Sequence, residues 1–129
     1  RNNAIMGGMV AALSDEDMRS LSVYFSQQKM QPSVAKDEKL LADGKTLWRK
    51  GDFEKGIPAC AGCHGPAGAG LPAQYPRLAG QYAEYTSTQL KNFRSQERAN
   101  DAEKVMRVIA GKLSDQQISA VAEYAAGLR

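Results

Sequence analysis

Apolar side chains recur at helical spacing in four stretches of the sequence, and no stretch shows the alternation typical of a β-strand. The stretches span residues 15–28, 37–50, 81–96 and 115 to about 126. Proline and glycine interrupt the pattern between 65 and 80, which predicts a long loop there. For the buried side of the third helix we expect Tyr82, Tyr85, Leu90 and Phe93. The pattern as a whole predicts an all-α protein.

Two of these helices begin in the same way. Ser14 and Ser114 are expected N-cap residues, and Asp17 and Gln117, three positions later, would close a capping box in each. The match continues at an offset of 100 along the flanks, pairing Met6 with Met106, Leu13 with Leu113, Leu21 with Val121 and Tyr24 with Tyr124. Two unrelated amphipathic helices can share a capping box, but the paired methionines argue against that alternative.

The repeat predicts how the chain is divided into domains. We interpret residues 1–28 as the C-terminal end of a first domain whose earlier part lies upstream of Arg1, and residues 37–129 as a complete second copy. Residues 29–36 contain a proline and a serine, break the helical pattern, and are expected to form the linker. The partial copy is therefore predicted to belong to a longer protein.

Both cysteines and the only histidine fall in one pentapeptide, Cys60-Ala61-Gly62-Cys63-His64. A Cys-x-x-Cys-His run is the attachment signature of c-type haem, in which the thiols form thioethers with the vinyl groups and the imidazole ligates the iron. A redox dithiol would be expected beside a βαβ pattern, which the chain lacks. A structural zinc site needs four ligands where three are clustered, and a disulfide across two residues would constrain little. We predict one covalent haem c, with its iron, in this chain.

Met106 is the only methionine downstream of the haem motif. A thioether favours ferrous iron, so ligation by histidine and methionine raises the reduction potential and leaves no open coordination position. The alternative is a core methionine among aliphatic neighbours. Because no second histidine exists and Lys104 is a poor soft donor, we predict Met106 as the sixth ligand. Met6 occupies the equivalent place in the partial copy, where we expect it to ligate the iron of a second haem in the longer protein.

Composition adds limits to this hypothesis. The 129 residues include 12 glycines and 5 prolines, and only 7% are aromatic, so a large apolar cofactor would supply much of the core. The formal charge of +3, from 17 basic and 14 acidic side chains spread evenly, gives no reason to expect a nucleic-acid partner. No apolar run approaches the roughly 18 residues needed to cross a bilayer. No transmembrane segment is expected in this chain.

These features together resemble a known family. The resemblance is carried by the Cys60–His64 motif, the loop Tyr75-Pro76-Arg77-Leu78-Ala79-Gly80, the helix segment Gln89-Leu90-x-x-Phe93-Arg94 and Met106. They resemble a class I cytochrome c, whose fold surrounds a covalent haem c. The tandem arrangement is similar to the C-terminal haem domain of the di-haem cytochrome c4 family, preceded by the end of the N-terminal haem domain.

The resemblance implies roles for five residues. Cys60 and Cys63 would form the thioethers, and His64 and Met106 would be the axial ligands. The carbonyl of Pro76 would accept a hydrogen bond from the ligand histidine and fix its ring. These assignments make all five residues parts of the haem site.

The resemblance also implies a crossing of the first and last helices of the complete domain, with Gly44 and Trp48 against Val121 and Tyr124. Four further side chains are candidates for hydrogen bonds to the haem propionates, although aromatic and basic residues on an amphipathic helix more often serve the core and the solvated face: Tyr82, Tyr85, Arg94 and Arg98.

The function implied by the resemblance is electron transfer, with the iron cycling between Fe(II) and Fe(III), in a protein that is not an enzyme. Covalent haem is attached outside the bacterial cytoplasm, so the periplasm is the expected location. Electrons would pass from a cytochrome bc complex to a terminal, cbb3-type cytochrome c oxidase, both membrane-bound. The alternatives are a cytochrome subunit or domain of a larger dehydrogenase, and a haem enzyme or sensor with a labile sixth ligand.

Overall fold

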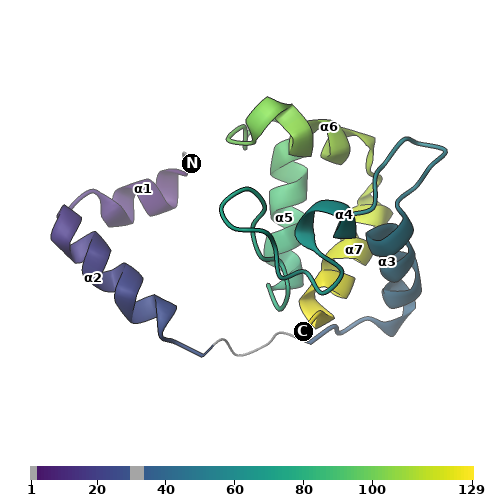
Figure 1. The fold of residues 1–129 in the computed structure, drawn as a ribbon. Helices are drawn as coiled ribbons and strands as arrows, with labels where there is room; N and C mark the ends of the chain where they lie inside the picture. The colour runs from purple at the N-terminus through teal and green to yellow at the C-terminus, as the bar shows by residue number, and fades with distance from the viewer. Residues whose placement is uncertain (1–2, 30–33) are drawn as a thin grey trace. The chain divides into compact units, whose positions relative to one another are not determined.

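The computed structural model describes residues 3–29 and 34–129. The chain separates into two units, Arg1–Gln31 and Pro32–Arg129, and each is described by itself. The first holds α1 (Ala4–Val10) and α2 (Asp15–Ser26), and the second holds α3 (Glu38–Lys50), α4 (Ala61–His64), α5 (Ala83–Arg94), α6 (Val105–Lys112) and α7 (Asp115–Gly127) (Figure 1). Two isolated bridges, Asp52 with Ile57 and Leu71 with Tyr75, are the only β pairing within the described residues. The all-α prediction is confirmed.

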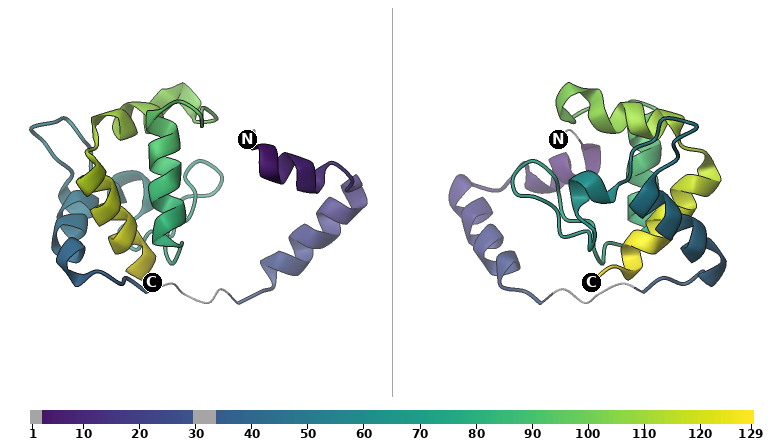
Figure 2. Two further views of the ribbon diagram at one scale, coloured as in Figure 1. Left: turned by 180° about the vertical axis from the view of Figure 1, so that it is seen from behind. Right: turned by 45° about the vertical axis from the view of Figure 1, so that its right-hand side comes forward.

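The second unit is built around α7, which packs against both α3 and α5 (Figure 2). Small side chains allow this close packing, because alanines occupy many of the buried positions of α7. The core cluster consists of Leu47, Trp48, Ile57, Leu113, Ile118, Val121 and Ala125, each 6% exposed or less. Every member of this cluster belongs to the second unit.

The predicted crossing of α3 and α7 is present. The rings of Trp48 and Tyr124 lie 6.2 Å apart. A Cβ on Gly44 would collide with the backbone carbonyl of Ala120 and lie 2.8 Å from the Cβ of Tyr124. Glycine is therefore required at position 44 by the close approach of the two helices.

The buried side of α5 differs from the prediction. Tyr82 is 68% exposed and Tyr85 is 40% exposed, whereas Thr86 and Phe93 are buried. The helix begins at Ala83, so Tyr82 precedes it. Thr86, Leu90 and Phe93 follow one another at four and three positions and therefore share a face. The expectation for Tyr82 and Tyr85 is wrong, because Tyr82 lies outside the helix and Tyr85 lies off the face that Thr86, Leu90 and Phe93 share.

In the first unit, both predicted capping interactions of α2 are present. Asp17 N donates to Ser14 Oγ at 3.1 Å, and Ser14 N donates to a carboxylate oxygen of Asp17 at 3.0 Å. No residue of α1 or α2 is buried, and several large apolar side chains are exposed, among them Ile5, Met6, Met9, Tyr24 and Phe25. Of the predicted linker 29–36, residues 30–33 lie outside the described residues.

Candidate haem site

The haem motif forms a single helical turn. Cys60 is the N-cap of α4, and His64 N donates to Cys60 O at 2.9 Å. Positions three and four apart lie on one face of such a turn, so Cys60, Cys63 and His64 project from the same side. Both cysteines are half-buried and unpaired. The local fold thus presents two thiols and one imidazole together.

The imidazole of His64 is fixed by the loop that follows it. His64 is 7% exposed, and its Nδ1 lies 2.9 Å from the carbonyl oxygen of Pro76. A carbonyl can only accept a hydrogen bond, so Nδ1 carries the proton and Nε2 keeps its lone pair. This is the tautomer and orientation that a metal-ligating histidine needs. The Pro76 contact expected from the resemblance is present, and its part in holding haem stays a prediction.

The loop after α4 owes its shape to backbone hydrogen bonds and glycine. Gly70 N donates to His64 O at 2.9 Å, and Leu78 N and Ala79 N both donate to Gly68 O. Gly70 has a φ of 78°, and a Cβ there would lie 2.6 Å from the backbone nitrogen of Arg77. The loop therefore folds back tightly, which brings Pro76 to the histidine.

Two aromatic rings flank the imidazole. The ring of Trp48 lies 6.4 Å from that of His64, and the ring of Tyr75 lies 6.1 Å from it on an edge-on approach. Trp48 is 1% exposed, and its indole N–H donates to the carbonyl of Pro66 at 3.2 Å. The indole thus ties α3 to the loop directly after the haem motif and restricts the space around the histidine.

The state of the thiols bears on the alternatives to haem. Burial raises the pKa of the Cys60 thiol to about 11. A redox-active dithiol needs a lowered thiol pKa, so the site is poorly suited to disulfide exchange. No group of three or more histidine, cysteine, aspartate or glutamate side chains suited to a metal is found within residues 3–29 and 34–129. Two unpaired thiols suit covalent attachment of haem c, and a histidine with an available Nε2 suits ligation of its iron.

Met106 lies on a different element from the motif. It is the second residue of α6 and is half-buried. Met6, its counterpart in the repeat, lies on α1 in the first unit and is 55% exposed. Ligation of iron by either methionine stays a prediction.

Two of the four candidates for hydrogen bonds to the haem propionates, Arg94 and Arg98, have protein partners. Arg94 donates to Asp115 Oδ1 at 2.6 Å and to Leu113 O at 3.3 Å, which ties α5 to the start of α7. The guanidinium of Arg98 lies 4.4 Å from the ring centre of Phe93 and donates to Gln89 Oε1 at 3.1 Å. The structure thus gives both arginines structural roles, and any bond from them to a propionate stays a prediction.

One interaction beside Met106 had no signal in the sequence pattern. Arg107 Nε donates to Asp101 Oδ1 at 2.8 Å, and Arg107 N donates to Asp101 Oδ2 at 3.0 Å. Burial raises the pKa of Asp101, but the hydrogen bonds and the charge of Arg107 outweigh that effect and leave the pKa below its usual value. An aspartate six positions before an arginine has no helical periodicity, so periodicity could not reveal this pair.

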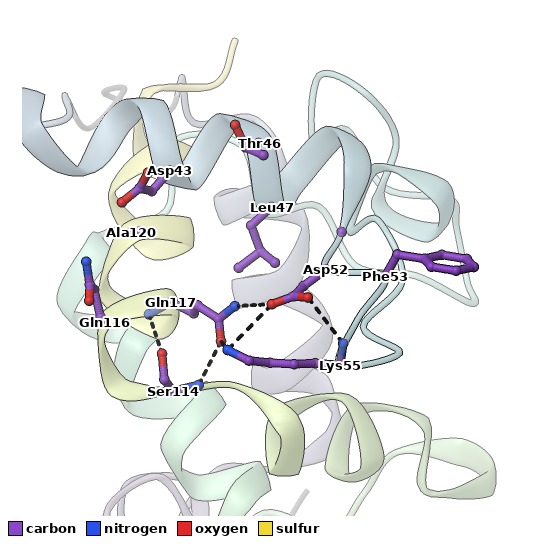
Figure 3. A pocket seen from close by; sticks show the side chains of 11 residues that line it. Asp43, Thr46, Leu47, Asp52, Phe53, Lys55, Ser114, Gln116, Gln117 and Ala120 are labelled. Atoms are coloured by element: carbon purple, nitrogen blue, oxygen red, sulfur yellow. Dashed lines mark hydrogen bonds and ion pairs between the residues drawn. The ribbon is translucent and has the colours of Figure 1, made fainter.

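An open pocket of about 510 Å³ lies elsewhere, between the end of α3 and the start of α7 (Figure 3). Its polar wall is a network in which Gln117 Nε2 donates to Asp52 at 2.9 Å and Lys55 Nζ donates to Gln117 Oε1 at 3.3 Å. Figure 3 shows the ring of Phe53 at its rim, pointing away from this network. None of the predicted haem ligands lines the pocket, so it forms no part of the candidate site.

Comparison with known proteins agrees with this geometry. Residues 41–128 match the family model for cytochrome c. The chain is 48% identical over 126 residues to cytochrome c4 of Azotobacter vinelandii, covering 95% of this chain and 59% of the relative. It is 45% identical to cytochrome c4 of Thiocapsa roseopersicina, covering 99% of this chain and 67% of the relative. It is 38% identical to a thiosulfate dehydrogenase electron acceptor of Thiomonas intermedia, covering 98% of this chain and 59% of that protein.

A solved structure matches as well. The reduced recombinant cytochrome c4 from Pseudomonas stutzeri superposes with a TM-score of 0.90 at 43% identity, covering all of this chain and 68% of that one. The helical fold, the Cys60–His64 turn and the family match define a class I cytochrome c with covalent haem c. The chain belongs to the cytochrome c4 family. It spans only 59% to 67% of the length of these curated relatives.

Proposed function

We propose that this protein is an electron carrier of the periplasm, with haem c held by Cys60, Cys63, His64 and Met106. The observation that carries the proposal is the hydrogen bond of 2.9 Å between Nδ1 of the buried His64 and Pro76 O, which leaves Nε2 available as a metal ligand. Membership of the cytochrome c4 family supports it. No helix in the described part of the chain is long and apolar enough to cross a bilayer.

When bound, haem c supplies a one-electron couple between Fe(II) and Fe(III). Pro76 fixes the ring of His64, so the ligand needs little rearrangement when the oxidation state changes. The thioether of Met106 would favour the reduced state and close the sixth position. Gly62 within the motif and Ala67 and Ala69 after it are exposed, and their small size would let a redox partner approach closely. The chain's work is to bind, orient and shield the cofactor.

Carbon monoxide tests this function against that of a haem enzyme or sensor. A closed sixth position predicts that the ferrous protein does not bind carbon monoxide at neutral pH. Met106→Ala removes the proposed ligand and should bind it readily, while His64 still anchors the haem. Ready binding by the parent protein would refute the carrier proposal.

The partners are proposed from two sources. The family resemblance suggests transfer from a cytochrome bc complex to a terminal cbb3-type oxidase. The relatives named as thiosulfate dehydrogenase electron acceptors favour a second candidate, in which a periplasmic dehydrogenase is the donor. Stopped-flow reduction of the ferric protein by each purified donor would discriminate between them. The true donor should reduce it at a rate that falls as ionic strength rises, if charges guide the encounter.

The domain division is part of the same proposal. Residues 1–28 would be the end of a first cytochrome domain, with Met6 as the axial ligand of its haem, and residues 29–36 would join it to the domain over 37–129. The shared capping boxes at Ser14 and Ser114 support this division. The domain division is tested by the intact mass of the protein as purified from its natural source and then denatured, because thioether-bound haem survives denaturation. Two haems on a longer chain are expected, and a single haem would refute the role of Met6.

A further inference from the structure

The segment that leads into Met106 is held at both ends by one ion pair. The carboxylate of Asp101 accepts hydrogen bonds from the backbone N–H of Arg107 and, with its other oxygen, from the guanidinium of the same residue, at 3.0 Å and 2.8 Å. The side chains are 6% exposed for Asp101 and 19% for Arg107. We call this pair, Asp101 with Arg107, the loop clamp.

The backbone inside the loop clamp does not follow local preference. Glu103 has a φ of 51° and Lys104 a φ of 59°, both in the left-handed region that side chains other than glycine seldom adopt. Lys104 is the N-cap of α6, yet its side chain makes no capping hydrogen bond. The N–H of Arg107, in the first turn of α6, is capped by Asp101 instead. A conformation disfavoured at two adjacent residues persists only where surrounding contacts fix it.

The burial of the pair points to a role in fixing a conformation. Of the three ion pairs in the described part of the chain, this one is the most enclosed, since Asp115 is 73% exposed in the pair with Arg94 and Lys55 is 51% exposed in the pair with Asp52. Desolvation offsets most of the attraction in a buried pair, which makes it a weak source of stability. Its geometric effect, in contrast, falls directly on residues 102–106, which lie between its two ends and include Met106.

The repeat supplies an internal comparison. At the offset of 100, Gly7 stands where Arg107 stands, and Arg1 where Asp101 stands. In α1 the N–H of Met6 donates to Asn3 Oδ1 at 2.9 Å, an ordinary cap three residues away. A methionine-bearing helix at this place in the repeat can therefore begin without a clamp, so helix formation alone does not require the pair.

We propose that Asp101 and Arg107 are positioning residues for Met106, which hold the first turn of α6 so that its thioether stays directed at the iron. This inference rests on the proposed function, in which Met106 is the sixth ligand. The loop clamp would limit how far the ligand moves when the oxidation state changes, and would keep competing ligands from the sixth position.

Three variants test the loop clamp. Asp101→Ala removes both hydrogen bonds, and Arg107→Gln removes the guanidinium while leaving the backbone bond. Asp115→Ala is the matched control, because it removes an aspartate–arginine pair that joins α5 to α7 and does not span Met106. The readouts are the sulfur-to-iron charge-transfer band of the ferric protein, carbon monoxide binding to the ferrous protein at neutral pH, and the reduction potential.

Asp101→Ala should weaken the charge-transfer band, lower the reduction potential and let carbon monoxide bind the ferrous protein at neutral pH, which the parent does not. Loss of a contact that supports a metal ligand typically weakens the ligand's hold on the metal about tenfold or more. Arg107→Gln should change the same readouts in the same direction by less, and it keeps the test decisive if Asp101→Ala fails to fold. Asp115→Ala should leave all three unchanged.

The inference is overturned if the Asp101 and Arg107 variants keep the parent's band and potential, still do not bind carbon monoxide, and lose only thermal stability. Failure of the proposed function looks different. In that case the parent itself lacks the charge-transfer band and binds carbon monoxide readily, before any substitution in the loop clamp is made.

Discussion

Gly44 fixes how closely α3 and α7 approach each other. Its missing side chain leaves room for the carbonyl of Ala120, and Trp48, one turn further along α3, packs beside Tyr124. Trp48 also flanks the ring of His64. A change in the distance between the two helices would therefore move a side chain that lies beside the ligand histidine. A substitution at position 44 therefore changes both stability and the surroundings of the ligand histidine.

Gly44→Ala should lower the free energy of unfolding by about 2 kcal/mol, because the new methyl group forces the helices apart in a packed interface. Gly127→Ala on α7 is the matched control, since a Cβ there meets Ala35 at an ordinary 3.6 Å. Denaturant unfolding of the haem-loaded proteins measures both. Equal stability of the two variants would contradict the argument from close approach.

Asp115 is expected to make a contribution to stability that depends on pH. The hydrogen bond and charge of Arg94 lower its pKa in the folded state. A lowered folded-state pKa stabilises the protein fully above the unfolded value of about 4, and the effect is lost as the pH falls through the lowered value. The stability difference between the parent and Asp115→Asn should be constant above about pH 5 and shrink toward acid.

Urea unfolding from acid to neutral pH measures this difference. Arg94→Gln removes the main cause of the lowered pKa of Asp115. The loss of stability toward acid that Asp115 causes should therefore be smaller in this variant than in the parent protein. A difference between parent and variant that grows as the pH falls would contradict the assignment.

At the scale of secondary structure, the start of α7 is set by its capping box. Gln117 N donates to Ser114 Oγ at 3.2 Å, and Ser114 N donates to Gln117 Oε1 at 3.0 Å. The same glutamine also donates to Asp52, so the cap connects α7 to the segment that leads to the haem motif. The cap thus serves both the helix and the loop.

Ser114→Ala should cost about 1 kcal/mol of unfolding free energy, the usual cost of losing an N-cap side chain. Gln116→Ala lies in the same turn, is exposed and is the matched control, for which no loss is expected. Thermal unfolding of both variants with haem bound provides the measurement. A loss of similar size in Gln116→Ala would assign the effect to the turn and not to the cap.

The elements differ in how far the sequence predicts them. The helices with long amphipathic stretches, α2, α3, α5 and α7, were predicted to within about two residues at each end. The short helices α1, α4 and α6 were not predicted, because one or two turns carry too little periodicity. The residues of the candidate site also differ in how far the sequence predicts them. The motif residues follow from spacing, whereas the contacts of Trp48, Asp101 and Arg107 arise only from tertiary structure.

At the scale of the whole molecule, the core of the haem domain is built from residues of the second unit. The core cluster lies entirely in the second unit, and no residue of α1 or α2 is buried. The family match over 41–128 falls within the same unit. Just before the domain boundary proposed at residue 37, Lys36 N donates a hydrogen bond of 2.8 Å to Glu123 Oε2. The second unit should therefore fold and bind haem without the first.

A chain of residues 37–129, produced where c-type haem is attached, should carry one covalent haem and keep the charge-transfer band of the parent. Its melting temperature should fall by no more than about 4 °C, because its core is complete and only exposed contacts are lost. A chain of residues 34–129 is the matched control, since it restores the bond from Lys36 to Glu123. If both chains lost the band or the haem, residues before position 34 would form part of the haem domain, and the boundary proposed at residue 37 would be wrong.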